Sequence, residues 1–381
     1  MSELVLTETQ EMLRRAAADF VAANCAPGDL RKLRDESATA GFSAKSWQAM
    51  ANLGWPGIVF PEEFGGLGLG YAEQAVVLEE LGSALAPEPF LTSVLLGGNA
   101  VLLGSNEPQK AALLPEVASG ALLLALAHHE PGARHDLFRV QTRAVRMADG
   151  WRIDGEKDFV LDGATAHRLV VSARLSGEPN ARQGIGLFLV EAGAPGLTLS
   201  PARLVDGRAT ARLELAGVQV APNAMLADQT QGGDVLENML DRAAVGLCGE
   251  MLGGMRRATE MTLDYLKTRE QFGVRIGSFQ SLKHRAARMF IELEIGRSAV
   301  MAAARALDAG SSDARSLVSI AKARLSDGFV EVASEALQMH GGIGMTDEHD
   351  IGLFLKRARV AELTLGDSAW HRDRWARLAG F

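Results

Sequence analysis

Three spaced segments in the last third of the chain contain residues suited to holding a phosphorylated cofactor. They read Tyr-Leu-Lys-Thr-Arg-Glu-Gln-Phe-Gly at 265–273, Gln-Met-His-Gly-Gly-Ile-Gly at 338–344 and Leu-Gly-Asp-Ser at 365–368. An arginine supplies charged donors to a pyrophosphate, and glycines let the backbone approach it closely. Each segment alone would be an ordinary helix end or turn, but their joint occurrence indicates a binding site.

The elements that must position these segments are predicted to be long helices. From Gly232 to the end of the chain, Gly and Pro become sparse and apolar residues recur at helical spacing. The apolar stripes are long enough for a four-helix bundle, and they cover 235–268, 276–309, 313–340 and 350–378. The three segments therefore stand in a helical context.

The residue pattern changes twice along the chain, from helical spacing to short β-rich runs and back. This predicts an α+β protein of three domains, at 1–120, 121–229 and 230–381. The first domain has the apolar spacing of helices, and the second consists of short β-rich runs divided by Gly, Pro and Asp, as in a compact antiparallel β-domain. The glycine-rich run at 64–70 is predicted to be a turn between helices. No strand plainly precedes it, and the Lys-Ser/Thr that a phosphate loop requires does not follow.

The composition is that of a globular protein without features for binding nucleic acid or membranes. The 381 residues carry a net charge of −8, so a surface that neutralises phosphates is not expected. The most apolar run, 121–127, is far shorter than the roughly 20 residues that cross a bilayer, and it is predicted to be a buried strand. Two distant cysteines, Cys25 and Cys248, and an acidic N-terminus favour a cytoplasmic protein over a secreted one.

In this domain order the three segments resemble the acyl-CoA dehydrogenases, and the resemblance covers almost the whole chain. It implies FAD as the cofactor, an acyl-CoA thioester as the substrate and an electron-accepting flavoprotein as a partner. In that family an Arg-x-x-Phe-Gly segment of one subunit reaches the flavin pyrophosphate of its neighbour. The resemblance therefore also implies a tetramer, in which each flavin site needs two subunits.

The resemblance implies a set of flavin-binding positions. A Gln-x-x-Gly-Gly-x-Gly segment works near the adenosine of FAD, and an aromatic residue of the β-domain packs on the flavin ring. Carried onto this sequence, the cofactor-binding residues are Arg269, Phe272, Gln280, Gln338, Gly341, Gly342, Phe159 and Asp367.

The β-domain departs from the family pattern where the flavin and the CoA chain are met. Glu130-Pro-Gly-Ala133 stands in place of Thr-Glu-Pro-Gly-Ala-Gly-Ser-Asp, and Leu161 replaces a hydroxyl residue that meets the flavin's reactive nitrogen. The other departures in this stretch are His128, His129, Arg134 and His135. No metal site is expected from these histidines, because neighbours on a strand point to opposite faces. A histidine or Arg134 could bind a CoA phosphate, or all four could be exposed loop residues.

The family's catalytic carboxylate falls at Leu365, which can supply only a backbone N–H. Because the reaction removes a proton from the acyl α-carbon, a catalytic chain must place another acid there. Some members use an acidic-Arg pair on a neighbouring helix, and Asp241 with Arg242 matches it if two residues are missing before Arg269. An acid stabilised by a helix dipole is the simpler explanation of Asp241, and Glu362 is a more distant alternative.

The resemblance leaves two main functions open. The first is FAD-dependent α,β-dehydrogenation of an acyl-CoA to the trans-2-enoyl-CoA, in a homotetramer. The second is a non-catalytic companion chain that completes the FAD site of a related partner in an α2β2 heterotetramer. The segments at 341–352 and 366–371 look most like the small subunits of such complexes, including pimeloyl-CoA dehydrogenase small subunits. An oxidase or nitroalkane-type variant of the fold is a further alternative.

Overall fold

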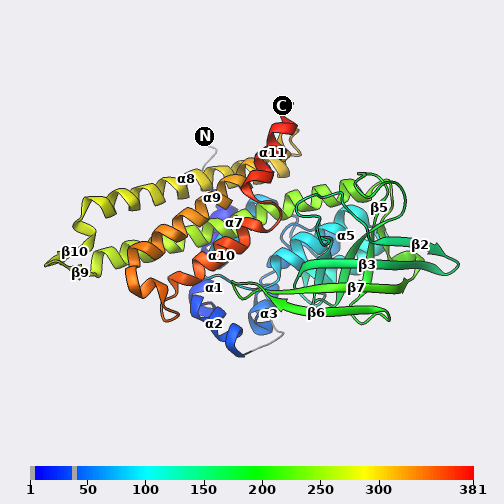
Figure 1. Ribbon diagram of the computed structural model, residues 1–381, viewed down its shortest axis with the longest axis horizontal. Coiled ribbons are helices and arrows are strands. Elements are labelled where there is room, and N and C mark those ends of the chain that lie inside the picture. The colour runs from blue at the N-terminus through cyan, green and yellow to red at the C-terminus, as the bar shows by residue number, and fades with distance from the viewer. Residues whose placement is uncertain (1–4, 37–40) are drawn as a thin grey trace. The chain divides into compact units, whose positions relative to one another are not determined.

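The computed structural model describes residues 5–36 and 41–381, and the chain divides into two compact units (Figure 1). Unit 1 consists of Met1–Lys32, Gly70–Ala86 and Ala244–Phe381, and unit 2 consists of Leu33–Leu69 and Pro87–Ala243. Helices, then strands, then helices follow one another along the chain, which confirms the predicted fold class. The predicted domain limits stay predictions.

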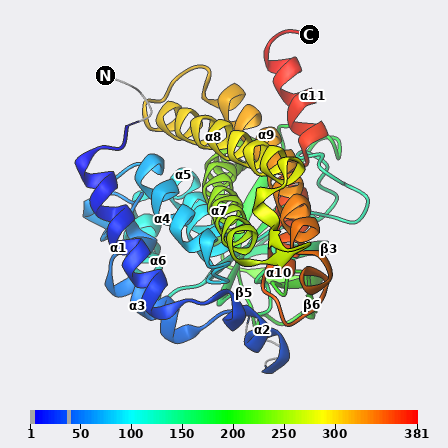
Figure 2. The same ribbon diagram turned by 90° about the vertical axis from the view of Figure 1, so that its left-hand side faces the viewer.

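Unit 1 is helical. Its elements are α1 (Glu8–Asn24), α4 (Tyr71–Ser83), most of α7 (Gly232–Thr268), the hairpin strands β9 (Glu270–Gln271) and β10 (Val274–Arg275), α8 (Gln280–Asp308), α9 (Ala314–His340), α10 (Ile351–Leu363) and α11 (Ser368–Leu378). Short 3-10 turns lie at η5 (Ile276–Ser278) and η6 (Gly341–Met345), and α2 (Pro27–Glu36) is shared with unit 2. Helix α9 packs against α8, α10 and α11, and α4 packs against α1 and α8 (Figure 2). The centre of this packing contains Leu325 and Phe329, which are fully buried.

Three of the four long helices predicted from the apolar stripes are confirmed within a few residues, as α7, α8 and α9. The fourth prediction, 350–378, is wrong as a single helix, because α10 and α11 are separated by the turn Thr364–Asp367. Leu365 and Gly366 have φ of 59° and 100° there, a backbone conformation that cannot continue a right-handed helix.

The glycine-rich run at 64–70 leads into the N-terminus of α4. In unit 1 the Asp308 carboxylate, at the end of α8, accepts from the N–H groups of Tyr71 and Ala72 at 2.7 and 3.0 Å. A Cβ at Gly70 would lie 2.5 Å from that carboxylate, so a side chain does not fit. The helix N-terminus, where a phosphate would bind, already has an anion from the chain itself.

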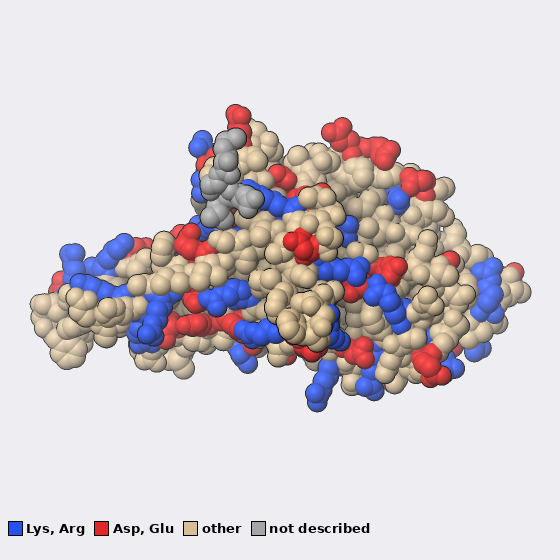
Figure 3. Space-filling model, turned by 90° about the horizontal axis from the view of Figure 1, so that it is seen from above, with Lys and Arg blue, Asp and Glu red and all other residues tan. Residues whose placement is uncertain are grey.

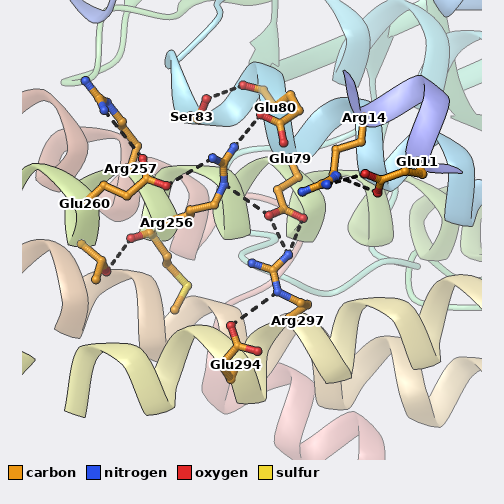
Figure 4. Close-up of polar contacts among 12 residues, drawn as sticks. Glu11, Arg14, Glu79, Glu80, Ser83, Arg256, Arg257, Glu260, Glu294 and Arg297 are labelled. Carbon is orange, nitrogen blue, oxygen red and sulfur yellow. Dashed lines mark hydrogen bonds and ion pairs between the residues drawn. The ribbon is translucent and has the colours of Figure 1, made fainter. Parts of the chain in front are cut away.

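A network of ion pairs joins α4, α7 and α8 within unit 1 (Figure 4). Glu79 of α4 accepts from Arg297 of α8 at 2.8 and 2.9 Å and lies 3.4 Å from Arg256 of α7. Arg256 also donates to the neighbouring Glu80 at 2.6 Å, and burial raises the pKa of Glu80. Glu260, which is more exposed, contacts Arg256 at 3.3 Å. Arg256 and Arg297 thus share Glu79, and Arg256 also binds Glu80. These contacts hold the three helices together.

Unit 2 is built around an eight-stranded sheet. The strands are β1 (Leu124–Ala127), β2 (Arg143–Met147), β3 (Gly150–Leu161), β4 (Arg168–Arg174), β5 (Ile185–Glu191), β6 (Leu197–Arg203), β7 (Ala209–Val220) and β8 (Met225–Ala227). Their order is β6-β7-β3-β2-β4-β5-β8, with β1 beside β4. The sheet is largely antiparallel, as predicted, but β4 pairs in parallel with both β1 and β2.

Unit 2 also contains helical elements. They are α3 (Ala44–Asn52), the π-helix η3 (Phe90–Gly98), α5 (Asn99–Gly104) and α6 (Glu107–Ala118), with 3-10 turns at η1 (Trp55–Gly57), η2 (Glu62–Phe64) and η4 (Pro222–Ala224). Among them, α5 packs against β8. The predicted buried strand at 121–127 is confirmed as β1, which packs against η3. The core of the sheet includes Ile153, Val171, Phe188 and Leu213, all with no exposed surface.

Acidic and basic side chains are interspersed on the face shown in Figure 3. The left end of unit 1 in Figure 3 is mostly tan, and the β9–β10 hairpin combines the exposed apolar residues Phe272 and Val274 with the exposed charges of Glu270 and Arg275. Within residues 5–36 and 41–381, no helix combines the length and apolar character needed to cross a bilayer.

Candidate functional site

The β9–β10 hairpin presents the first cofactor segment at an exposed tip. Gln271 pairs with Val274 across a two-residue turn of Phe272 and Gly273, and both turn residues have positive φ, 56° and 76°. Such backbone angles are what a tight hairpin turn requires. The Phe272 side chain is 91% exposed, and its ring meets the edge of Phe279 at 6.1 Å.

Two more predicted positions flank the hairpin. Arg269 follows the last residue of α7, and its carbonyl accepts from the N–H of Ile276 at 2.9 Å, which closes the base of the hairpin. Gln280 is the first residue of α8. Both side chains are exposed, so Arg269, Phe272 and Gln280 are brought together on one accessible loop.

The second cofactor segment lies at the C-terminal end of α9. Gln338 is exposed, and Gly341 ends the helix with φ of 65°. Between them, the buried His340 ring stacks on Tyr265 of α7 with centroids 4.6 Å apart. Because Tyr265 stands four residues before Arg269, this contact brings the two segments to the same end of unit 1.

These positions fit the phosphates and adenosine of FAD. Among the described residues, no atom lies within 4 Å of where a Cβ would stand at Gly341 or Gly342, so a ligand can approach the backbone. Arg269 and Gln280 add exposed donors of the kind that a diphosphate binds. The donor set and the free space are therefore suitable for the cofactor.

The third segment forms the turn between α10 and α11. Asp367 is the N-cap of α11 and accepts from the N–H of Trp370 at 2.8 Å, so the structure gives it a capping contact. His371 Nε2 lies 2.9 Å from the Leu365 carbonyl oxygen, and as donor it binds that oxygen. Leu365 has a half-buried side chain.

Lys322 of α9 lies beneath this turn with no exposed surface. Its ammonium donates to the carbonyl oxygens of Gly366 and Glu362 at 2.8 and 3.0 Å and to Ser326 Oγ at 2.9 Å. All three acceptors are uncharged. Burial lowers the pKa of Lys322 from its usual range to about 8, which still leaves the side chain charged at neutral pH.

Two residues of the segment at 128–135, His128 and Glu130, belong to a buried polar network in unit 2. Lys157 Nζ donates to Glu130 Oε1 at 2.7 Å and to Ser172 Oγ at 3.0 Å, and Ser172 Oγ lies 2.9 Å from His128 Nδ1. Burial lowers the pKa of Lys157 to about 8 and that of His128 to about 3, so the histidine is neutral. Burial alone would raise the pKa of Glu130, but Lys157 and two backbone donors hold it below its usual range.

The predicted flavin-facing aromatic, Phe159, lies in β3 of unit 2 with φ of 49° and 59% exposure. Its ring meets His129 edge-on, with centroids 5.5 Å apart. His129 Nδ1 is buried and has no hydrogen-bond partner within the described residues. Across those residues, no group of three or more His, Cys, Asp or Glu side chains is arranged to hold a metal ion.

The two candidate bases have different surroundings. Asp241 lies in the part of α7 that belongs to unit 2, and its side chain is 3% exposed. Arg242 donates to the Asn238 carbonyl at 3.0 Å. Glu362, in α10 of unit 1, is paired with Arg359 at 2.7 Å. Burial sets Asp241 apart from an ordinary surface acid.

Sequence reasoning missed Lys322, His371 and the Lys157–Glu130 pair. A signal for Lys322 was present, because this lysine interrupts the apolar run Ile320-Ala321-Lys322-Ala323 inside a helical stripe. A charge at such a position indicates either a surface helix face or a buried cation with a purpose. No comparable signal marks Lys157, whose partner is 27 residues away.

Three family models match successive parts of the chain. They describe the acyl-CoA dehydrogenase N-terminal domain, at residues 7–121, the middle domain, at 125–218, and the C-terminal domain, at 230–379. The chain is 31% identical over 378 residues to mitochondrial isovaleryl-CoA dehydrogenase of Pongo abelii, which covers 96% of this chain and 88% of that protein.

Two solved structures share the fold over nearly the full length of the chain. Butyryl-CoA dehydrogenase from Megasphaera elsdenii superposes with a TM-score of 0.91 at 25% identity, covering 98% of this chain and 99% of that one. A chain of the ChsE4-ChsE5 complex from Mycobacterium tuberculosis superposes with a TM-score of 0.89 at 27% identity, covering 100% of both chains.

Proposed function

The chain belongs to the acyl-CoA dehydrogenase family, and from this premise we propose that it takes part in FAD-dependent α,β-dehydrogenation of an acyl-CoA thioester to the trans-2-enoyl-CoA. FAD, when bound, supplies the acceptor for two electrons, which then pass to a flavoprotein partner.

The observation that carries the proposal is the exposed hairpin tip. Phe272 is 91% exposed and held at positive φ beside Arg269. A large apolar ring at a strained backbone position is costly unless something covers it. Its position supports a role in which Phe272 and Arg269 reach the FAD of another subunit, as the matching segment does in the acyl-CoA dehydrogenases. Gln338, Gly341 and Gly342 would then hold the adenosine end of FAD.

For the proton transfer we assign Asp241 as the base and Arg242 as its partner. Asp241 is the buried one of the two candidate carboxylates, and a base of this kind must be shielded from water to act on an α-proton. Phe159 would pack on the flavin ring with His129 behind it.

A second candidate function is the non-catalytic companion chain, and Leu365 favours it. This residue replaces the usual carboxylate in a turn that is otherwise ordered by Lys322, Asp367 and His371. The related ChsE4-ChsE5 structure is a complex of two chains, which is the assembly that a companion would join. The likeness to pimeloyl-CoA dehydrogenase small subunits and the cytoplasmic location remain predictions.

The test is to purify the chain alone, record its flavin spectrum and add a panel of acyl-CoA thioesters without oxygen. Bleaching of the flavin band by one class would establish a self-sufficient dehydrogenase. Bound flavin that no thioester reduces, or no flavin at all, would instead favour the companion function. Co-expression with a related chain should then give a mixed tetramer, whereas persistent homotetramers would count against it.

A matched variant separates the two functions further. Leu365→Glu puts a carboxylate on the turn without touching Asp241 or the hairpin. If the chain lacks only the base, this variant should gain flavin bleaching that the parent chain does not show. If Asp241 already serves as the base, Leu365→Glu should bring no gain.

A further inference from the structure

In the turn Thr364–Asp367, the carbonyl oxygens of Leu365 and Gly366 accept hydrogen bonds, while Thr364 donates to the Val360 carbonyl oxygen through its N–H at 3.1 Å. The Glu362 and Gly366 oxygens accept from the Lys322 ammonium, and the Leu365 oxygen lies 2.9 Å from His371 Nε2. Neither the Leu365 nor the Gly366 N–H donates to any acceptor in residues 5–36 and 41–381. The turn therefore offers an excess of hydrogen-bond donors, which suits an electron-rich oxygen.

Lys322 adds a positive charge that has no ion-pair partner in the described chain. Its three acceptors are two backbone carbonyls and a hydroxyl, at 2.8 to 3.0 Å, and the residue has no exposed surface. A buried charge that makes no direct ion pair is expensive to keep, since its hydration is lost. A protein that retains such a cation gains from it most when negative charge appears nearby.

The charged and titratable groups that face Lys322 leave that positive charge in place. Glu362 of α10 is paired with Arg359, and Asp327 of α9 is paired with Arg372. Asp367 caps α11 through the N–H of Trp370. Burial raises the pKa of Cys248, on α7, to about 12, so that thiol is neutral. The three carboxylates attract Lys322 and partly offset the effect of burial on its pKa, but each makes a closer contact elsewhere, and the thiol contributes no charge.

We propose that Lys322 is a positioning residue that holds the Leu365–Gly366 backbone so that its N–H groups bind the carbonyl oxygen of the acyl thioester. The inference rests on the proposed function and goes beyond it by naming Lys322 as the positive charge that stabilises the thioester oxygen. When the α-proton passes to a base, the electron pair of the broken C–H bond spreads onto the thioester oxygen. The turn donors and the ammonium behind them stabilise that developing negative charge.

If Lys322 stabilises the thioester oxygen, it should increase the acidity of a bound thioester in addition to any effect on folding. Acetoacetyl-CoA is a suitable probe, because its β-keto thioester loses a proton to solvent and its enolate absorbs in the near ultraviolet. The protein is purified in the assembly that retains FAD, and the enolate absorbance of the bound probe is followed against pH. We expect Lys322→Met to raise the apparent pKa of the bound probe by about one unit or more, a tenfold weaker stabilisation.

Three companion variants sharpen this measurement. Lys322→Gln keeps an N–H donor without the charge and is the substitute if Lys322→Met does not fold. Lys322→Arg keeps the charge and should recover most of the wild-type acidity. Lys45→Met removes an exposed lysine from α3 and should leave the probe's pKa unchanged. Hydrogen exchange at residues 364–367 should quicken in Lys322→Met, with the remainder of unit 1 unchanged.

The outcomes distinguish this inference from the proposed function. If wild-type protein binds FAD and the probe, and Lys322→Met binds both with an unchanged enolate pKa, the positioning role is wrong and the proposed function stands. If the wild-type assembly holds neither FAD nor thioester, the proposed function fails first, in the flavin spectrum, and the inference falls with it. A raised enolate pKa in Lys322→Met, restored in Lys322→Arg, supports the assignment.

Discussion

Lys157 and Glu130 form an ion pair with 2.7 Å between Nζ and Oε1, and the two side chains have 0% and 5% exposed surface. The pair joins β3 to the segment that follows β1, and Glu130 also accepts from the N–H groups of Gln141 and Thr142 at 2.6 and 3.0 Å. Three separate stretches of unit 2 are therefore fixed around one carboxylate.

Removing one member of this pair should destabilise the protein strongly. Lys157→Met leaves Glu130 buried without its cation, which we expect to lower the free energy of unfolding by about 3–5 kcal/mol. The double variant Lys157→Met/Glu130→Gln should recover part of that loss, because no charge is then buried and the amide oxygen still accepts from one of the two backbone N–H groups. Urea denaturation measures both, and equal losses in the single and double variants would contradict the argument.

The same lysine should make stability rise with pH above neutrality. Its pKa is lowered from 10.5 to about 8 by burial, so between these values the unfolded chain holds more protons than the folded one. The free energy of unfolding should gain roughly 1.4 kcal/mol per pH unit for each such lysine in that window. Lys322, with its pKa also lowered to about 8, adds a second contribution. The slope is measured between pH 8 and 9, below the usual pKa of 9.0 of the Cys248 thiol, whose raised pKa opposes the lysines at higher pH. There Lys322→Gln should show about half the wild-type slope, and an unaltered slope would exclude Lys322 as a source.

The ion-pair network of Figure 4 predicts a contrast between two glutamates that share Arg256. Glu79→Gln removes a carboxylate with a 12% exposed side chain that binds two arginines, and should cost roughly 1–3 kcal/mol of stability. Glu260→Gln removes a 44% exposed partner and should cost about 0.5 kcal/mol or less. Thermal denaturation of the two variants compares them directly. Similar losses would mean that burial of the network carries little energy.

If Asp241 is the base, Asp241→Asn should abolish flavin reduction by the active acyl-CoA while the flavin spectrum and FAD content stay as in the parent chain. The amide is similar in shape but cannot accept the α-proton. Glu362→Gln is the matched variant, since it alters the other candidate acid. The rate of flavin bleaching, followed by stopped flow under anaerobic conditions, decides between Asp241 and Glu362. If Asp241→Asn bleaches at the parent rate, Asp241 is not the base.

Phe272→Gly separates backbone strain from the contribution of the ring. Glycine adopts positive φ without cost, so the variant chain should be as stable as the parent or more stable by about 1 kcal/mol. If the ring packs in the FAD site of a neighbouring subunit, FAD affinity should fall about tenfold or more. Phe381→Ala removes another exposed ring of unit 1 and should leave FAD binding intact. Flavin fluorescence on dilution measures the affinity, and unchanged binding in Phe272→Gly would remove the ring from the site.

The long helices could be predicted from the regular spacing of apolar residues, whereas features that depend on contacts between distant parts of the chain could not. Helices α7, α8 and α9 follow directly from apolar spacing, because each buries apolar residues on one face, which in α8 begins at Met289. The break at Leu365 escaped that reasoning, since leucine favours helices and only tertiary contacts from Lys322 and His371 hold it at positive φ. The parallel pairings of β4 likewise depend on the sheet order and not on local pattern.

The candidate site shows the same division. Motif spacing indicated the hairpin residues and the glycines after α9, and the structure places both segments at one end of unit 1 through the Tyr265–His340 contact. Spacing could not indicate which buried polar groups support the site. Lys157 and Glu130 come from strands and loops whose proximity arises only when the sheet forms.

The Asp308 cap on α4 has a consequence for the order of folding. The carboxylate and the N–H group of Tyr71 that it binds are separated by 237 positions in the chain, and unit 1 draws its residues from three separate stretches. During synthesis the segments of unit 2 emerge while the last stretch of unit 1 is still unmade, so α4 must wait with an uncapped N-terminus. Because unit 1 needs contacts between stretches far apart in the chain, its completion should be the slow step, after unit 2 has formed.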